Sequence, residues 1–220
     1  MKRSIAIVQT SAVSSQELKG LCAELLPGVE VNQIIDDSLI REVNANGGPT
    51  VGVRRRMYAY FRQAESLGVD LILSQCSSVG EVVDEVRSFL STPIVKIDEP
   101  MARKAVETGT RIGVIATVAT TVGPSVRLIE RVAREAGVAV QIEEHLVKDA
   151  MMILIERGDA KLHNKMVRGE VLRAAETNDV IVLAQGSMTV LLPELTDVER
   201  PVLSSPRLAV EHIRSLLFSR

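Results

Sequence analysis

The sequence is poor in aromatic residues, with no Trp, two Tyr and three Phe among 220 residues. This scarcity argues against a base-stacking platform for nucleic acid and against a carbohydrate site built on aromatic faces. The formal net charge of −2 gives no attraction to nucleic acid or to an anionic membrane. We therefore expect neither a nucleic-acid partner nor a membrane partner.

Cysteine is also scarce, because Cys22 and Cys76 are the only two in the sequence. With no CxxC spacing, the pair favours neither a disulfide framework nor a structural zinc site. His145, His163 and His212 have no metal-ligand spacing, so we assign no metal. No apolar run approaches the roughly 20 residues that span a bilayer. These absences predict a soluble, cytoplasmic protein.

Three common functional motifs are missing from the sequence, namely GxGxxG, GxxxxGK[ST] and GxSxG. The first two are glycine-rich turns that hold phosphates, and the third presents a nucleophilic serine. Their absence weakens the dinucleotide-binding, nucleotide-binding and serine-hydrolase interpretations.

The sequence does contain short apolar runs that alternate with longer segments of helical periodicity. This alternation is typical of an α/β fold with a mostly parallel sheet covered by helices. The expected strands are 5–8, 29–35, 71–74, 94–97, 112–116, 138–142, 180–183 and 202–203. The expected helices are 14–26, 52–67, 79–90, 100–108, 123–136, 149–157, 161–176 and 206–218.

Three segments of the chain recur in the same order at nearly one offset, between 107 and 109 residues. The run from Asp70 to Val79 aligns without gaps on the run that begins at Asp179, and there Gln185 stands in the place of Cys76. The other two matches pair the segments at 5–10 and 112–117, and those at 93–95 and 201–203. The repetition predicts an internal duplication.

The duplication predicts two similar α/β lobes whose equivalent strand ends face one another. We expect residues 1–98 with 206–220 to form the first lobe, and residues 99–205 to form the second. Open α/β sheets bind ligands at the carboxyl ends of their strands. The expected active site is therefore a cleft between the lobes, with Cys76 and Gln185 on opposite walls.

Cys76 is the main candidate for a reactive residue, because an apolar strand ends there and a helical pattern begins just after it. Unpaired N–H groups and the helix dipole favour an anion at such a junction, so we expect the thiolate to be stabilised. The alternative is an ordinary buried strand cysteine, since free cysteine is among the most buried residue types. Cys22 shares an apolar helical stripe and is interpreted as a core residue.

Small polar residues follow the equivalent strands of both predicted lobes. Their hydroxyl and N–H groups can bind a carboxylate or stabilise an enolate-like intermediate, although ordinary helix capping explains several of them equally well. The candidate substrate-binding residues are Thr10, Ser11, Ser77, Ser78, Thr117, Thr120, Thr121, Gly186 and Ser187.

Three other polar segments have simpler interpretations. Asp36 and Asp37 could bind a substrate, but we interpret them as turn residues. The loop Asn44–Pro49 is either a lid or a surface turn. The run Arg54–Arg56 is interpreted as a solvated face, with one arginine reaching an anionic substrate as the alternative.

These segments together resemble the aspartate/glutamate/hydantoin racemase superfamily over nearly the whole chain. The resemblance is carried by the strand ending in Gln-Thr-Ser, by Ser-Gln-Cys-Ser-Ser-Val-Gly-Glu, by Pro-Ile-Val-Lys-Ile-Asp-Glu-Pro-Met, by Ile-Gly-Val-Ile-Ala-Thr and by Val-Ile-Val-Leu-Ala-Gln-Gly-Ser-Met. It implies two pseudo-symmetric Rossmann-like lobes, a small carboxylate substrate, no cofactor and a homo-oligomer, often a dimer.

In the racemases of this superfamily, two cysteines face each other across the α-carbon of the substrate, and each transfers a proton. Cys76 matches the first cysteine, whereas Gln185 occupies the second position. An amide cannot exchange a proton as a thiol does, so we expect Gln185 to orient or polarise the substrate. The leading interpretation is an isomerase with Cys76 as its acid/base. The alternatives are a one-cysteine decarboxylase, a cis-trans isomerase or a non-catalytic binding protein.

Overall fold

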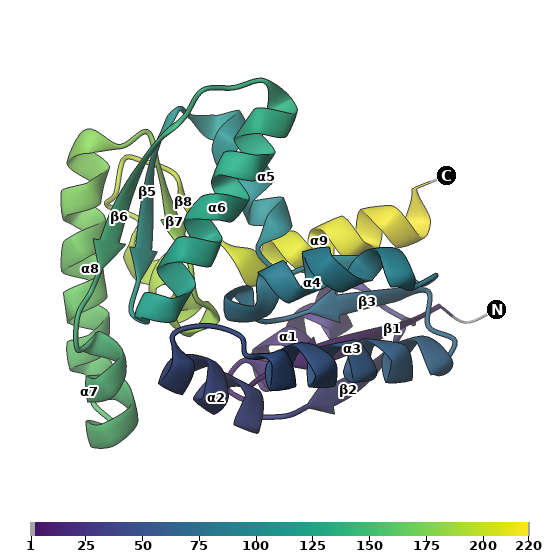
Figure 1. The fold of residues 1–220 in the computed structure, drawn as a ribbon. Helices are drawn as coiled ribbons and strands as arrows, with labels where there is room; N and C mark the ends of the chain where they lie inside the picture. Colours follow the sequence, from purple (N-terminus) through teal and green to yellow (C-terminus); the bar gives the residue numbers. More distant parts are fainter. Residues whose placement is uncertain (1–2, 220) are drawn as a thin grey trace. The chain divides into compact units, whose positions relative to one another are not determined.

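The computed structural model describes residues 3–219 and divides into two compact units. Unit 1 combines Met1–Ile97 with Pro206–Arg220, and unit 2 is Asp98–Ser205. Each unit contains a four-stranded parallel sheet covered by helices, which confirms the α/β class (Figure 1).

The sheet of unit 1 has the strand order β2-β1-β3-β4 and is parallel throughout. The central strands β1 (Ser4–Gln9) and β3 (Leu71–Ser74) are almost completely buried. They are continuous apolar runs because helices cover both of their faces. The outer strands are β2 (Glu30–Ile35) and β4 (Ile94–Lys96).

Alternate side chains of β1 and β3 enter two separate cores in unit 1. Ile5 and Ile7 pack against α1 (Ser15–Leu25) and α9 (Ser205–Phe218). Ala6, Val8 and Ile72 pack on the other face. The helices there are α2 (Ser38–Asn46), α3 (Val51–Ser66) and α4 (Gly80–Val86).

Helix α2 was not expected from the sequence, and the predicted loop Asn44–Pro49 is partly helical. Leu39 and Val43, one helical turn apart, are fully buried and hold α2 on the core. The helix ends at Gly47, whose φ of 68° is the left-handed conformation that glycine adopts at low cost. Residues 47–50 alone connect α2 with α3.

The sheet of unit 2 has the order β6-β5-β7-β8, which repeats the topology of unit 1. Its strands are β5 (Arg111–Ala116), β6 (Gln141–Leu146), β7 (Val180–Leu183) and β8 (Val202–Ser204). The registers repeat as well, because Ile5 pairs with Leu71 in unit 1 and Ile112 pairs with Val180 in unit 2.

An aspartate at the start of each third strand repeats one hydrogen bond in both units. Asp70 accepts a hydrogen bond from the backbone N–H of Ser4 at 2.8 Å, and Asp179 accepts one from Arg111 at 2.9 Å. These carboxylates also pair with the side chains of Arg3 and Arg111, respectively. The recurrence of these contacts supports the repeat that the sequence predicts.

Helices cover both faces of the unit 2 sheet. Helix α8 (Ala160–Thr177) packs on Ile115, Ile181 and Leu183. Strand alternation turns Val114 and Val182 to the opposite face, where α5 (Glu99–Thr108) and α6 (Ala119–Ala136) lie. The short helix α7 (Ala150–Arg157) follows β6.

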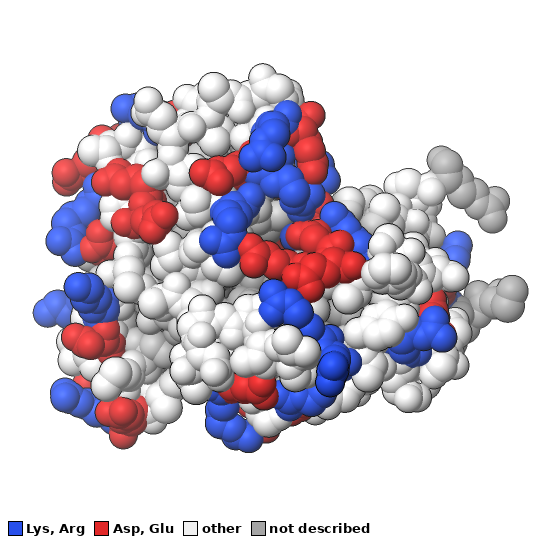
Figure 2. All heavy atoms as spheres, in the orientation of Figure 1, with Lys and Arg blue, Asp and Glu red and all other residues white. Residues whose placement is uncertain are grey.

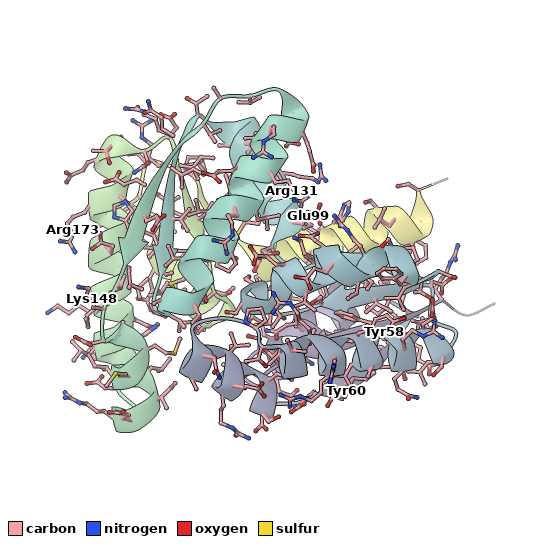
Figure 3. The ribbon with its side chains drawn as sticks, viewed as in Figure 1. Tyr58, Tyr60, Glu99, Arg131, Lys148 and Arg173 are labelled. Carbon is pink, nitrogen blue, oxygen red and sulfur yellow. The ribbon has the colours of Figure 1, made fainter. Side chains whose placement is uncertain are left out.

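Charged side chains of both signs intermingle on the face shown in Figure 2. On unit 2, Glu99 of α5 pairs with Arg103 at 3.1 Å and with Arg131 of α6 at 3.4 Å. Glu99 and Arg131 are labelled in Figure 3. Such partly exposed pairs link α5 and α6 but add little stability individually. Within residues 3–219, no helix is both long and apolar enough to cross a membrane.

Candidate functional site

In both units, a 3₁₀ segment that begins with small residues follows the buried third strand. Strand β3 leads through Cys76 into η1 (Ser77–Val79), and β7 leads through Gln185 into η3 (Gly186–Glu194). Cys76 (φ −118°, ψ 119°) and Gln185 (φ −141°, ψ 140°) both have extended backbones just before the turn. Each unit therefore presents one side chain from the same structural position.

Cys76 is partly buried and surrounded by hydrogen-bond donors. Burial raises the pKa of the Cys76 thiol above its ordinary value, and this is the largest effect. Hydrogen bonds from the side chain of Thr10, the backbone and side chain of Ser78 and the backbone N–H of Val79 act in the opposite direction. Because burial outweighs these donors, Cys76 rests as a neutral thiol at pH 7.

The expected stabilisation of the Cys76 thiolate is therefore only partly correct. The donors of the turn and of Thr10 are present, but the cost of burying a charge is larger than their effect. Cys22 differs because burial is what shifts its pKa. Burial alone raises its pKa to about 11, and the side chain lies in the core against α9.

Gln185 is held by Thr117, which follows β5. Its Oε1 accepts hydrogen bonds from the backbone N–H of Thr117 at 2.6 Å and from its hydroxyl at 3.0 Å. Thr117 occupies the position in unit 2 that Thr10 occupies in unit 1. A threonine after the first strand of each unit thus contacts the side chain that follows the third strand.

Four of the remaining predicted site residues lie in the segments that follow β3 and β7. Ser77 and Ser78 form η1, and Gly186 and Ser187 begin η3. Ser11 instead accepts a hydrogen bond from the backbone of Val13 at 3.2 Å.

Thr120 and Thr121 differ from the expectation because they lie within the first turn of α6 rather than in a loop before it. The expected helix start was Gly123, and the structure places the start at Ala119. Thr121 is 4% exposed, so this part of the predicted polar rim is mostly buried.

Gln9 is a polar residue at the end of the unit 1 sheet that was not among the predicted site residues. It ends β1, is fully buried, and accepts a hydrogen bond from Ser15 Oγ at 3.0 Å. Its Nε2 has no hydrogen-bond partner among residues 3–219. A glutamine that ends an otherwise apolar strand, directly before Thr10, was the signal in the sequence.

The aspartate that follows β2 forms a turn, as interpreted. Asp36 accepts hydrogen bonds from the backbone N–H of Ser38 at 3.0 Å and from the hydroxyl of Tyr60 at 2.7 Å (Tyr60 is labelled in Figure 3). Arg56 pairs with Asp36 at 3.1 Å and also with Glu42. Arg56 is therefore a structural residue rather than part of a solvated face.

The structure shows no recognisable metal centre within residues 3–219. In the part of the chain that the structure describes, no group of three or more His, Cys, Asp or Glu side chains could hold a metal ion. The polar groups around Cys76 and Gln185 are a thiol, an amide, hydroxyls and backbone N–H groups. Such groups can transfer a proton, through the thiol, and stabilise an oxyanion, through the neutral donors.

Comparisons with known proteins agree with this architecture. The structure of allantoin racemase from Klebsiella pneumoniae matches with a TM-score of 0.74 and 19% identity, over 98% of this chain and 87% of that one. Glutamate racemase isoform RacE1 from Bacillus anthracis matches with a TM-score of 0.73 and 15% identity, over 99% and 82% of the two chains. At these identities the likeness concerns the fold.

A local sequence match points the same way. A stretch of 57 residues is 42% identical to glutamate racemase from Picosynechococcus sp., and it spans 26% of this chain and only 20% of that relative. The family model described as Asp/Glu/Hydantoin racemase matches residues 7–213, which include all the strands except the first three residues of β1, and also the segments that follow β3 and β7. The chain therefore belongs to the Asp/Glu/hydantoin racemase family.

Proposed function

We propose that this protein is a cofactor-independent isomerase that transfers a proton at the α-carbon of a small carboxylate or amino-acid-like substrate. Cys76 is its acid/base in this proposal. The observation that carries the proposal is the placement of a partly buried thiol among the donors of Thr10, Ser78 and Val79, at the carboxyl end of a central strand.

The proton balance of the step is simple. In the acid direction, the S–H bond of Cys76 breaks and its electron pair remains on sulfur as a thiolate. The electron pair of the enolate-like intermediate forms the new C–H bond at the α-carbon. In the reverse direction, the thiolate removes the α-proton, and the electron pair moves toward the carboxylate oxygens.

The surroundings of Cys76 suit a group that alternates between two protonation states. Burial favours the thiol, which is ready to donate a proton, while three residues supply donors to the thiolate that remains. Neutral donors would bind the substrate carboxylate in this proposal, because hydroxyl and N–H groups stabilise an oxyanion without a metal. The candidates for this role are Thr10, Ser11, Ser77, Ser78, Thr117, Thr120, Thr121, Gly186 and Ser187.

A second candidate function follows from Gln185. An amide does not serve as a second acid/base, so a reaction that needs a single thiol, such as protonation of an enediolate after decarboxylation, is the alternative. A binding protein that retains the site without chemistry is the non-enzymatic alternative. Deuterium exchange separates both enzymatic candidates from the binding protein.

The experiment follows α-deuterium incorporation by NMR in D₂O. The panel contains both enantiomers of aspartate, glutamate and allantoin, and also methylmalonate, from which CO₂ release is measured. We expect exchange or CO₂ release with wild type and Cys22→Ala, and a loss of about 10² to 10⁴-fold in Cys76→Ala. Undiminished turnover in a folded Cys76→Ala protein would overturn the role of Cys76. A folded wild type that turns over no panel member would favour the binding protein.

A further inference from the structure

Two equivalent helices of the repeat pack on their own sheets to different extents. Helix α2 follows the outer strand β2 of unit 1, and α7 follows the outer strand β6 of unit 2. In α2, Leu39 and Val43 are fully buried. In α7, Ala150 is the one buried residue, whereas Met152 and Ile155 are 55% and 73% exposed. A helix at this position therefore has few apolar anchors.

A carboxylate on α2 supplies polar contacts that α7 lacks. Glu42 pairs with Arg56 of α3 and accepts a hydrogen bond from the hydroxyl of Thr50, which caps α3. Arg56 also donates hydrogen bonds to Asp36 at 3.1 Å and to Ser38 at 2.6 Å. Within residues 3–219, no side chain of α7 forms a hydrogen bond or an ion pair. The polar contacts therefore fasten α2 to α3 at its start and at its middle.

The connection between α2 and α3 has the properties of a hinge. It consists of residues 47–50, and Gly47 has the left-handed φ of 68°. A Cβ atom added to Gly47 or to Gly48 would have no heavy atom within 4 Å. The rest of the chain is thus not packed against these two residues. Hinges are typically a few residues at the end of an element that can change their backbone angles in this way.

Helix α2 closes the apolar cluster on which Cys76 packs. Leu39 and Val43 belong to the cluster between the sheet and α3, and the Cys76 side chain packs against the same cluster. Cys22 belongs to the other cluster of unit 1, with core residues of α9. Movement of α2 away from the sheet would therefore open the surroundings of Cys76 and leave those of Cys22 closed.

We propose that α2 is a movable cover on the Cys76 side of unit 1 and that Glu42 is the latch that holds it closed. Opening breaks the contacts of Glu42 with Arg56 and Thr50 and turns α2 about residues 47–50. Such local opening occurs without unfolding of the whole unit. The inference rests on the proposed function as far as catalysis is concerned, because a substrate must reach Cys76. Access to the thiol, however, is measurable without a substrate.

The test compares the alkylation rates of Cys76 and Cys22 in the same molecule, by mass spectrometry at one pH. Iodoacetamide is the small reagent, and a maleimide joined to polyethylene glycol is the bulky one. Glu42→Ala removes the latch, and Glu42→Gln keeps its shape but removes its charge. Asp37→Ala is the matched control, because it removes an exposed ion pair with Arg41 at the same helix.

We expect Cys76 to react about tenfold faster with iodoacetamide in Glu42→Ala, and less so in Glu42→Gln, because charge-assisted hydrogen bonds are lost. The acceleration should be larger with the bulky reagent, which needs a wider opening. Cys22 in every variant, and Cys76 in Asp37→Ala, should react within about twofold of their wild-type rates.

These comparisons separate opening of α2 from other causes of faster alkylation. Unfolding of the whole unit would accelerate Cys22 together with Cys76, and a lower pKa of Cys76 would accelerate both reagents equally. Either result, an equal effect of Asp37→Ala, or unchanged Cys76 rates in both Glu42 variants would overturn the latch. Failure of the wild type to turn over any substrate would count against the proposed function alone, because the alkylation rates do not depend on turnover.

Discussion

The Nζ atom of Lys96 lies 2.6 Å from Oδ2 of Asp84, and the lysine side chain is only 5% exposed. Lys96 ends β4 and pairs in register with Ser74 of β3, two residues before Cys76. Asp84 lies on α4, directly after the Cys76 turn. A Cβ atom added to Gly80 would lie 3.6 Å from the lysine side chain. The ion pair therefore joins α4 to the end of β4, which lies beside the strand that leads to Cys76.

Asp84→Ala should destabilise the protein by about 3 kcal/mol or more, because the variant leaves the buried Lys96 ammonium without this partner. Urea unfolding measures the change. Asp37→Ala is the matched control, since it removes an exposed ion pair with Arg41 and should cost less than about 1 kcal/mol. Equal decreases in the free energy of unfolding in Asp84→Ala and Asp37→Ala would show that the Lys96–Asp84 pair does not hold α4 in place.

The alkylation of Cys76 by iodoacetamide should depend on pH with a midpoint above the ordinary thiol value of about 8.5. The reason is that burial raises its pKa, so the reactive thiolate fraction is small at pH 7 and grows as pH rises. Cys22→Ala removes the second thiol, whose pKa is about 11. Mass spectrometry at several pH values gives the profile, and a midpoint below 8 would contradict the expected environment.

Thr10→Val and Thr117→Val form a matched pair because the two threonines are equivalent in the repeat. Loss of the Thr10 hydroxyl removes a hydrogen bond that lowers the pKa of Cys76, so alkylation at pH 8 should slow about threefold to tenfold. Thr117→Val removes a hydrogen bond to Gln185 instead and should leave alkylation of Cys76 unchanged. Similar rates in the two variants would show that Thr10 does not act on the thiolate.

Gln185→Cys places a thiol at the position that is equivalent to Cys76 in unit 2. If Gln185 occupies the place of a second proton-transfer group, the variant should convert more of its exchange events into inversion. Chiral chromatography gives inversion, NMR in D₂O gives exchange, and their ratio should rise at least about tenfold, as expected for one positioned proton-transfer group. An unchanged ratio in an active, folded variant would argue against this position as the site of stereochemical control.

The stability of unit 2 should depend on Asp179 at low pH. Hydrogen bonds from the side chain and backbone of Arg111 lower the pKa of Asp179 to about 2. A depressed pKa contributes stability above the unfolded-state value of about 4, and this contribution is lost as pH falls toward 2. Asp179→Asn should therefore melt below wild type at pH 6, and the difference should shrink by pH 2.5. A difference in melting temperature that stays the same at both pH values would show that stability does not depend on the ionisation of Asp179.

Strands of continuous apolar sequence were predictable because their burial on both faces requires such runs. The expected ranges 71–74 and 180–183 agree with β3 and β7. Strand β6 was expected at 138–142 but lies at Gln141–Leu146, where alternating polar residues occupy a partly exposed outer strand. Helix α2 was missed because its asparagines resemble a loop, although Leu39 and Val43 are spaced as helical core residues.

The equivalent placement of Cys76 and Gln185 was predictable from the repeat, but the effect of the surroundings on the pKa of Cys76 was not. The repeat identified Gln185 as the counterpart of Cys76, and both precede equivalent turns. Whether burial or donors dominate at Cys76 depends on the packing around β1 and β3, which a local pattern does not contain. The hydrogen bonds from Thr117 to Gln185 likewise join residues 68 positions apart.

Because of helix α9, the segments of unit 1 are not all synthesised before unit 2 is complete. Unit 2 is one continuous stretch of chain, whereas unit 1 needs the last helix to complete the core around Ile5 and Leu73. Helix α9 emerges from the ribosome only after unit 2 has been made. It carries the core residues Ala209, Val210 and Ile213. Because domains form as their segments emerge, the sheet face of unit 1 that α1 and α9 cover together has only α1 on it until α9 is made. A nascent chain stalled before α9 is thus the form in which this protein is most exposed to chaperones and proteases.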